Sequence, residues 1–403
     1  MEITVNACAS LDDVIAALTP ITHYFGRVPT AEDSERVIAV LPTDRALLAR
    51  CGSKEVGGAG SVPFDLTVPG GVVRAAGTTV VGVLPTHRRR GVLRSLMRAQ
   101  LDDIHARRKP VACLWASEEP IYGRFGYGLA SWALEVNVPI PSPFEYPLPA
   151  RGEIDLLDEE TALEPFAQVY DRVRIDHPGM FSRTEAWWKV RRLADPEKRR
   201  AGRGVLNRAL LRIDGKAEAY ALYRVEQSLE AGVSSGHVAV IEAIGATPEA
   251  TREIWRFLLD IDWVAHVRAE QLPIDHPLLM LLARPRLARI RMTDALRVRL
   301  VDVPAALAAR RFGAAAPVTI QVADPFCPWN EGVYEIGEHK VERTNAPPDL
   351  SLDVTALGSV YLGGITLRSL AAVQRVTERT PGAIARADVL FAAEQSPWCP
   401  EIF

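Results

Sequence analysis

The chain has 403 residues, a length that predicts two or three domains. Hydrophobic residues make up 48% and charged residues 24%, as in ordinary globular proteins, and the net charge of −3 argues against a nucleic-acid-binding protein. The five cysteines include no Cys-x-x-Cys pair, so we expect neither a metal site nor a disulfide framework, and a reducing cytosol fits best. Because the sequence has no signal-peptide pattern and no long apolar stretch, we expect a cytoplasmic protein without a membrane span. Secretion by a non-standard route stays open.

The segment from residue 78 to residue 128 carries the most information about function. Residues 78–84 are a β-branched apolar run that predicts a strand, which Pro85 ends. After three arginines and Gly91, apolar residues recur with helical spacing as far as Ile104, which predicts an amphipathic helix of about 16 residues. Residues 111–116 then predict a second buried strand.

The junction between the first strand and this helix has the chemistry of an anion-binding site. A helix N-terminus offers free N–H groups and the positive end of the helix dipole, and the arginines place cationic side chains at the same point. We therefore expect a bound pyrophosphate here. The residues that we expect to contact it are Arg89, Arg90, Gly91, Val92, Leu93 and Arg94. The alternative is an ordinary solvated helix start.

Two motifs in this segment resemble those of the GNAT acetyltransferases. In that family a basic or amide residue and x-x-Gly-x-Gly/Ala open the coenzyme A helix, and here Arg88, Gly91 and Leu93 hold those positions, with Leu93 in place of the small residue. Residues 122–127, Tyr-Gly-Arg-Phe-Gly-Tyr, resemble the family's Tyr-x-x-x-Gly-Phe element. The whole chain resembles the Eis family of aminoglycoside and polyamine N-acetyltransferases. That resemblance rests on Pro-Thr-His-Arg-Arg-Arg-Gly, Ile-Tyr-Gly-Arg-Phe-Gly-Tyr-Gly, a later Tyr-Leu-Gly-Gly and the final Glu-Ile-Phe.

The resemblance implies acetyl-CoA as cosubstrate and no metal. The strand residues Val81, Gly82 and Val83 are expected to pair with the amides of the pantetheine arm, in the way that a peptide adds to a sheet edge. Gly82 would allow the backbone to approach the ligand closely, and the N–H of Val83 would meet the thioester carbonyl. Ser117 and Glu118 would lie alongside, at the end of the neighbouring strand.

The resemblance also implies two catalytic groups. Tyr122 would protonate the departing thiolate; the alternative is a packing tyrosine, the role that we expect for Tyr127. The C-terminal carboxylate of Phe403 would be the base, although chain ends are ordinarily frayed.

The rest of the chain predicts two further regions. Residues 139–149 contain five prolines and predict a linker. Beyond it, the order of helices and strands to residue 293 repeats that of the first region, but Gly245-Ala-Thr-Pro-Glu stands in place of the arginines. Residues 294–403 read as α+β, with a strand near 296–303 and helices at 305–311 and 367–377.

With the resemblance, the predicted fold class is α/β plus α+β: two GNAT-like domains in tandem and a sterol-carrier-protein-like domain. The expected ranges are 1–145 for the catalytic domain, 146–293 for a degenerate copy and 294–403 for the third domain, whose C-terminus returns to the active site. A homohexamer is expected from the resemblance alone.

Three functions follow from these patterns. The first is N-acetylation of small polycationic amines, for which Glu32, Asp33, Glu35 and Glu401 are the acids that we expect near the substrate. The second is acetylation of a protein lysine or N-terminus, which needs the same site. The third, from a different class, is a lipid or sterol carrier, which needs an apolar cavity in the third region.

Overall fold

A computed structural model describes residues 2–200 and 202–403. The chain forms two compact units. The first contains the residues up to Ser131, Ala295–Pro397 and Glu401–Phe403, and the second contains Trp132–Asp294 and Trp398–Pro400. Among the described residues, no helix is both long and apolar enough to cross a bilayer.

The first unit is built on a seven-stranded sheet with the order β1-β2-β3-β4-β5-β16-β6. Its strands are β1 (Ile3–Ala7), β2 (Ala46–Cys51), β3 (Lys54–Val68), β4 (Gly71–Val83), β5 (Val111–Leu114), β6 (Gly128–Leu129) and β16 (Arg297–Leu300). β4 and β5 are parallel neighbours, and α3 (Val92–Ala106) connects them. The predicted strand, helix and strand of residues 78–116 are therefore confirmed.

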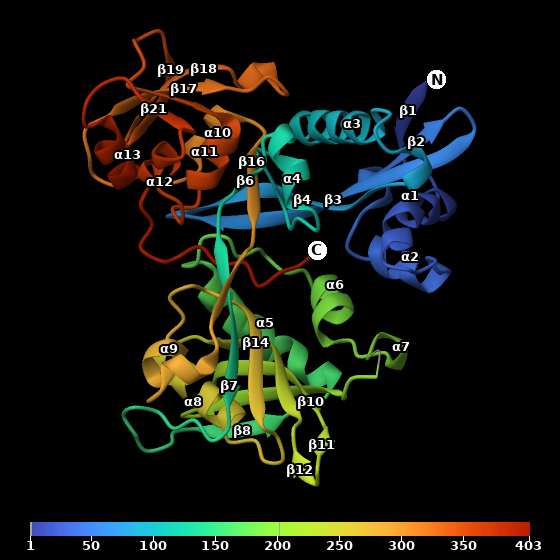
Figure 1. Ribbon diagram of the computed structural model, residues 1–403, viewed down its shortest axis with the longest axis vertical. Coiled ribbons are helices and arrows are strands. Elements are labelled where there is room, and N and C mark those ends of the chain that lie inside the picture. The colour runs from blue at the N-terminus through green and yellow to red at the C-terminus, as the bar shows by residue number, and fades with distance from the viewer. Residues whose placement is uncertain (1, 201) are drawn as a thin grey trace. The chain divides into compact units, whose positions relative to one another are not determined.

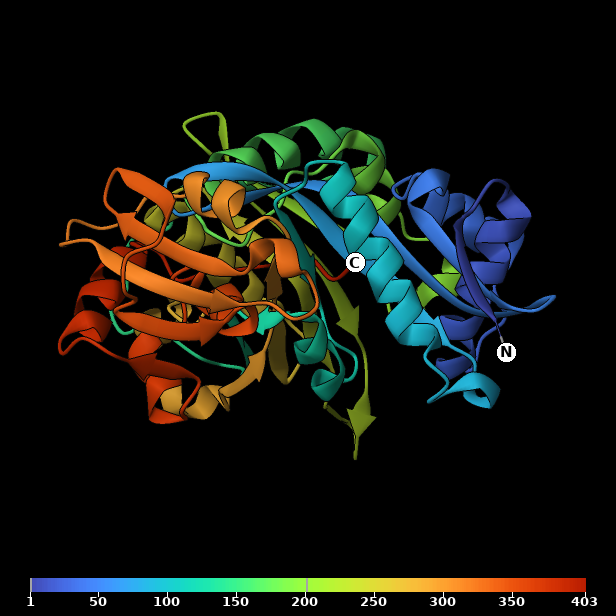
Figure 2. The ribbon, with the colours of Figure 1, turned by 90° about the horizontal axis from the view of Figure 1, so that it is seen from above.

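Helices cover both faces of this sheet. The apolar stripe of α3, which includes Leu96, Met97 and Leu101, is fully buried, and Figure 2 shows the helix lying along the long strands β3 and β4. The opposite face carries α1 (Leu11–Tyr24), which is followed by α2 (Ala31–Ile38). α1 approaches so closely that a Cβ at Gly58 would lie 1.9 Å from the carbonyl oxygen of Ala17. Glycine is therefore required there by packing.

An irregularity in β4 opens the sheet beside β5. Gly82 pairs with Gly58 and Thr79 with Gly60, so β4 holds one extra residue between these pairs, and Val80 takes a φ of 49°. β5 pairs with β4 only from Ala75 to Gly77. Among the described residues, the last part of β4, from residue 78 to residue 83, therefore has no strand on its β5 side.

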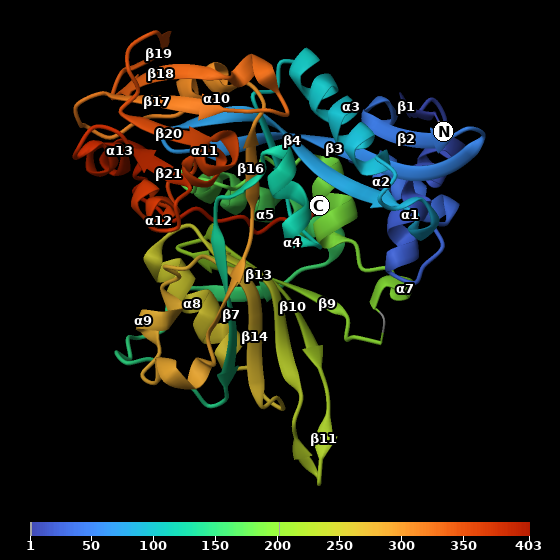
Figure 3. The ribbon, with the colours of Figure 1, turned by 45° about the horizontal axis from the view of Figure 1, so that its top comes forward.

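The third region folds around a five-stranded sheet with the order β19-β18-β17-β20-β21, and Figure 3 shows α11, α12 and α13 beside it. The strands are β17 (Val318–Ala323), β18 (Gly332–Gly337), β19 (Lys340–Thr344), β20 (Leu350–Asp353) and β21 (Val376–Glu378). The helices are α10 (Val303–Ala308), α11 (Val354–Val360), α12 (Leu367–Ala372) and α13 (Ala383–Phe391). The helix predicted to reach residue 377 ends at Ala372, because Gln374 has a φ of 60° and the chain then enters β21.

The second unit contains another seven-stranded sheet, with the order β15-β7-β14-β13-β10-β9-β8. Its strands are β7 (Trp132–Pro139), β8 (Glu153–Leu156), β9 (Leu206–Ile213), β10 (Lys216–Glu226), β13 (His237–Gly245), β14 (His266–Leu272) and β15 (Arg291–Asp294). Helices α5 (Glu159–Arg174) and α8 (Pro248–Leu259) pack on it through buried side chains such as Phe166 and Trp255.

Two strands pair in sheets outside the predicted domain range in which each falls. β7 falls within the predicted range 1–145, but it pairs with β14 and β15 in the second sheet. β16 falls within the predicted third region, but it lies between β5 and β6 in the first sheet, and Figure 1 shows it beside β6. Local sequence predicted the strand near 296–303 but could not predict its partners, because strand pairing depends on residues far along the chain. The predicted limits at 145 and 293 do not coincide with the points where the chain changes sheet.

Candidate active site

The open edge of β4 presents the backbone of Val83. The N–H of Leu84 donates to the carbonyl of Val56 in β3 at 2.9 Å. Because successive residues of a strand direct their backbone groups to opposite sides, the N–H and the carbonyl of Val83 point away from β3. The carbonyl of Val83 accepts a hydrogen bond from the hydroxyl of Tyr24 at 2.8 Å. The N–H of Val83 therefore faces the side of β4 that no described strand occupies, where an extended ligand could pair with it.

The structure shows a packing role for Gly82 that the sequence did not predict. A Cβ at residue 82 would lie 2.7 Å from the backbone nitrogen of Ile21 in α1. Glycine is therefore needed for the approach of α1, and the expected contact of Gly82 with the ligand stays a prediction.

The arginine loop, residues 85–91, leaves the start of α3 without a capping side chain. The loop begins with a 3₁₀ turn, Pro85–His87, and both Arg89 and Gly91 have left-handed backbone conformations, with φ of 60° and 88°. Gly91 is the N-cap residue, and no described side chain bonds to the first turn of the helix. The N–H groups of that turn are therefore available to an anion.

The residues predicted to contact the anion differ in the groups that they can present to it. Arg89, Arg90 and Arg94 are exposed, whereas the side chain of Val92 is buried and that of Leu93 packs against the core, so these two can contribute only their backbone N–H groups. Arg90 lines a cavity of about 350 Å³ together with Ile3, Cys51 and His87. The guanidinium carbon of Arg94 lies 5.2 Å from the centre of the Phe326 ring, in the third region.

Ser117 and Glu118 follow the end of β5 and are exposed. Glu118 is the N-cap residue of α4 (Glu119–Tyr122), which begins the Tyr122 turn, residues 119–128. The turn continues as a 3₁₀ segment, Gly123–Phe125, and ends at Gly126 with a φ of 88°. The chain therefore changes direction sharply just after Tyr122.

Tyr122 and Tyr127 occupy different environments in this turn. Their rings meet edge to face, with centroids 6.1 Å apart. Burial, with a smaller effect from the charge of Glu118, raises the pKa of Tyr122 to about 12, so its hydroxyl is protonated at neutral pH. Tyr127 is completely buried and its hydroxyl lies 2.9 Å from the Thr78 hydroxyl, as expected for a core residue.

The end of the chain lies against β3 and β4 in the first unit. The Phe403 ring is 5.3 Å from the Phe64 ring, and a Cβ at Gly77 would lie 3.0 Å from it. Ala76 packs into the core cluster that contains α3, so Phe403 lies on the face opposite to that helix. No periodicity or motif in the sequence indicated Phe64 as a neighbour of the chain end.

The acids that we expected near the substrate have separate positions. Asp33 caps α2 by accepting from the N–H of Thr30 at 3.2 Å, and it lies 3.6 Å from the Arg27 guanidinium. Glu32 and Glu35 are exposed on the same helix, whereas Glu401 is buried. Asp33 therefore has a structural role in helix capping.

Comparison with known proteins places these features in a family. The GNAT acetyltransferase domain matches residues 9–130 and again residues 179–300, and the sterol carrier protein domain matches residues 303–400. The crystal structure of Eis1 from Mycobacterium abscessus is 35% identical and has a TM-score of 0.87 over 99% of this chain and 100% of that one. N-acetyltransferase Eis of Mycobacterium tuberculosis is 32% identical over 97% of this chain and 98% of its own length.

The chain belongs to the Eis family of N-acetyltransferases. A protein from Streptomyces avermitilis, named as an uncharacterized N-acetyltransferase, is 40% identical over 96% of both chains. The protein is thus an acetyl-CoA-dependent N-acetyltransferase, and the resemblance inferred from its motifs is confirmed. The predicted fold class, two GNAT domains followed by a sterol-carrier-like domain, is confirmed as well.

Proposed function

We propose that this Eis-family enzyme acetylates small amines that carry several positive charges, as aminoglycosides and polyamines do. The observation that carries the assignment of the site is the open edge of β4, which ends at the uncapped, arginine-flanked start of α3. Membership of the Eis family supports small polycationic amines as the class of substrate. The net charge of −3 and the exposed carboxylates of Glu32 and Glu35 favour a cationic substrate.

The transfer requires that the amine nitrogen attack the thioester carbon, that the carbon–sulfur bond break and that a proton reach the thiolate. In our proposal the N–H of Val83 donates to the oxygen on which negative charge develops. The hydroxyl of Tyr122 donates its proton to the leaving sulfur. Burial raises the pKa of Tyr122 to about 12, so its hydroxyl carries a proton at neutral pH that can pass to the sulfur, which becomes more basic as the carbon–sulfur bond breaks.

The attacking nitrogen must also lose a proton. We assign that proton to the C-terminal carboxylate of Phe403, which takes it directly or through a water molecule. The negative charge of the carboxylate also stabilises the positive charge that forms on the nitrogen during attack. The contact of the Phe403 ring with Phe64 supports this role, because it holds the chain end against the first sheet.

Thiol release from acetyl-CoA tests the proposed function. The full-length protein is incubated with acetyl-CoA and, separately, with a polyamine, an aminoglycoside, a lysine-containing peptide and a simple monoamine. We expect kcat/KM to be highest for the polycationic small molecules. A marked preference for the peptide would favour the protein-acetylating alternative, and no release with any amine would contradict the assignment.

Lipid carriage is not our proposal for the third region. Its core contains the fully buried side chains of Tyr334 and Tyr361. Their hydroxyls donate to the backbone carbonyls of Asn330 and Ala306, both at 2.7 Å. At both positions the interior is therefore a packed core in which the buried hydroxyl has a hydrogen-bond partner.

Arg89→Ala and Arg90→Ala are each expected to weaken acetyl-CoA binding. A charge-assisted hydrogen bond to a phosphate is worth about 1.5–3 kcal/mol, so each loss should raise Kd by about ten- to a hundredfold. Calorimetric titration with acetyl-CoA measures the change. Arg368→Ala is the matched control, because Arg368 is exposed on α12 and lies 3.9 Å from Asp388. If both variants bind like the wild type, the arginine loop is not the phosphate site.

A further inference from the structure

The Tyr122 turn is held by hydrogen bonds that converge on one carbonyl. The carbonyl oxygen of Gly123, the residue after Tyr122, accepts from the N–H of Gly126 at 3.0 Å. It also accepts from the hydroxyl of Thr355 at 3.2 Å. Thr355 lies in α11, within the sterol-carrier-like region. A side chain from the third region thus fixes the backbone next to the proposed acid.

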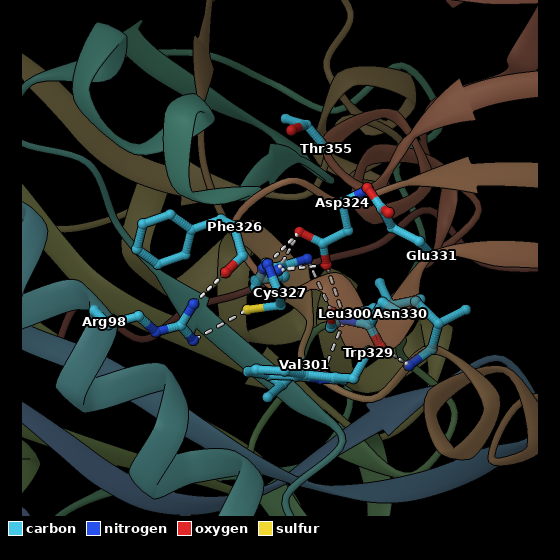
Figure 4. Close-up of polar contacts among 12 residues, drawn as sticks. Arg98, Leu300, Val301, Asp324, Phe326, Cys327, Trp329, Asn330, Glu331 and Thr355 are labelled. Carbon is cyan, nitrogen blue, oxygen red and sulfur yellow. Dashed lines mark hydrogen bonds and ion pairs between the residues drawn. The ribbon is translucent and has the colours of Figure 1, made fainter.

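A buried ion pair lies beneath the other end of the turn. Arg299 of β16 is completely buried, and its guanidinium is so close that a Cβ at Gly126 would lie 2.7 Å from its Cζ. Its Nη2 donates to both carboxylate oxygens of Asp324, at 2.9 and 2.7 Å. Asp324 also accepts from the amide of Asn330 at 2.8 Å and from the N–H of Cys327 at 3.0 Å, and Figure 4 shows these groups together.

The segment that follows Asp324 contacts both the Tyr122 turn and α3. The ring of Phe326 meets that of Phe125, in the Tyr122 turn, edge to face at 5.1 Å. The guanidinium of Arg98, in α3, lies over the same ring at 4.6 Å and donates to the carbonyl of Phe326. The third region therefore contacts both elements that carry the proposed site in the first unit.

We propose that the sterol-carrier-like region positions the acid of the transfer reaction. Thr355, together with the Arg299–Asp324 pair, is a positioning group for the hydroxyl of Tyr122. A helix as short as α4 is marginal by itself, and proton transfer requires donor and acceptor to be placed within a fraction of an ångström. This inference rests on the proposed role of Tyr122.

Thr355→Val tests the proposal because it removes the hydroxyl at nearly constant volume. One neutral hydrogen bond is lost, so kcat is expected to fall about three- to tenfold, with the KM for acetyl-CoA unchanged. Thr355→Ser keeps the hydroxyl and should retain the wild-type rate. Thr319→Val makes the same change elsewhere in the third region, where the hydroxyl donates to the carbonyl of Pro347 at 2.9 Å and accepts from the N–H of Asp349 at 2.9 Å, and should leave kcat unchanged.

A double-mutant cycle with Tyr122→Phe separates positioning from a general loss of structure. If Thr355 acts through the Tyr122 hydroxyl, Thr355→Val should have no further effect on kcat once that hydroxyl is absent. Losses that multiply in the double variant, or an unchanged kcat in the single Thr355→Val variant, would overturn the proposal. An unchanged rate in Tyr122→Phe alone would instead reject the proposed acid, which keeps the two failures distinguishable.

Discussion

Tyr122→Phe is expected to lower kcat by about 10²–10³-fold, the usual size of a general-acid effect, and to leave acetyl-CoA affinity nearly unchanged. The phenylalanine ring keeps the edge-to-face contact with Tyr127, at a centroid distance of 6.1 Å, so only the hydroxyl is lost. Without it, the thiolate must leave unprotonated or take its proton from water. Thiol release at saturating acetyl-CoA and amine gives kcat, and calorimetric titration gives the affinity.

Tyr127→Phe is the matched control for that experiment. Its hydroxyl lies 2.9 Å from that of Thr78 inside the core, so its loss should cost about 1 kcal/mol of stability and change kcat little. The thermal midpoint and kcat of both variants are measured together. If instead Tyr127→Phe has a low kcat and Tyr122→Phe has the wild-type kcat, Tyr127 would be the general acid.

Changing the C-terminus is expected to have the largest effect of all. Deleting Phe403 moves the terminal carboxylate back by one residue, about 3.4 Å along an extended chain, and removes the ring that contacts Phe64. Adding two glycines keeps the ring and removes the charge at residue 403. Both changes should lower kcat by about 10²–10⁴-fold, the range for loss of a general base.

Phe403→Ala separates the ring from the carboxylate. It keeps the terminal charge and removes the contact with Phe64, so we expect a smaller loss of kcat than in the chain with two added glycines. Measured rates for the three variants, with acetyl-CoA and one polyamine, give the comparison. Full activity in the chain that ends in added glycines would exclude the terminal carboxylate as the base.

Much of the site in the first unit could be predicted from local sequence. The strand that ends at Pro85, the arginine loop and the apolar stripe of α3 lie within 30 residues of one another, and the structure contains all three. Strand composition, helical spacing and a glycine before a helix are signals that depend only on residues close together in the sequence. For that reason the loop could be proposed as an anion-binding site from residue types alone.

The tertiary structure decided the contacts that join distant parts of the chain. Thr355 meets Gly123 across 232 residues, β16 enters the first sheet beside β5, and Phe403 packs on Phe64. Gly82 illustrates the difference, because nothing near it in the sequence indicated that α1 packs against it. Such contacts depend on how whole elements pack, and no local pattern of hydrophobicity or charge specifies which distant side chain completes them. The arginine loop and Tyr122 could thus be proposed from sequence, whereas the contacts of the third region with α3 and the Tyr122 turn could not.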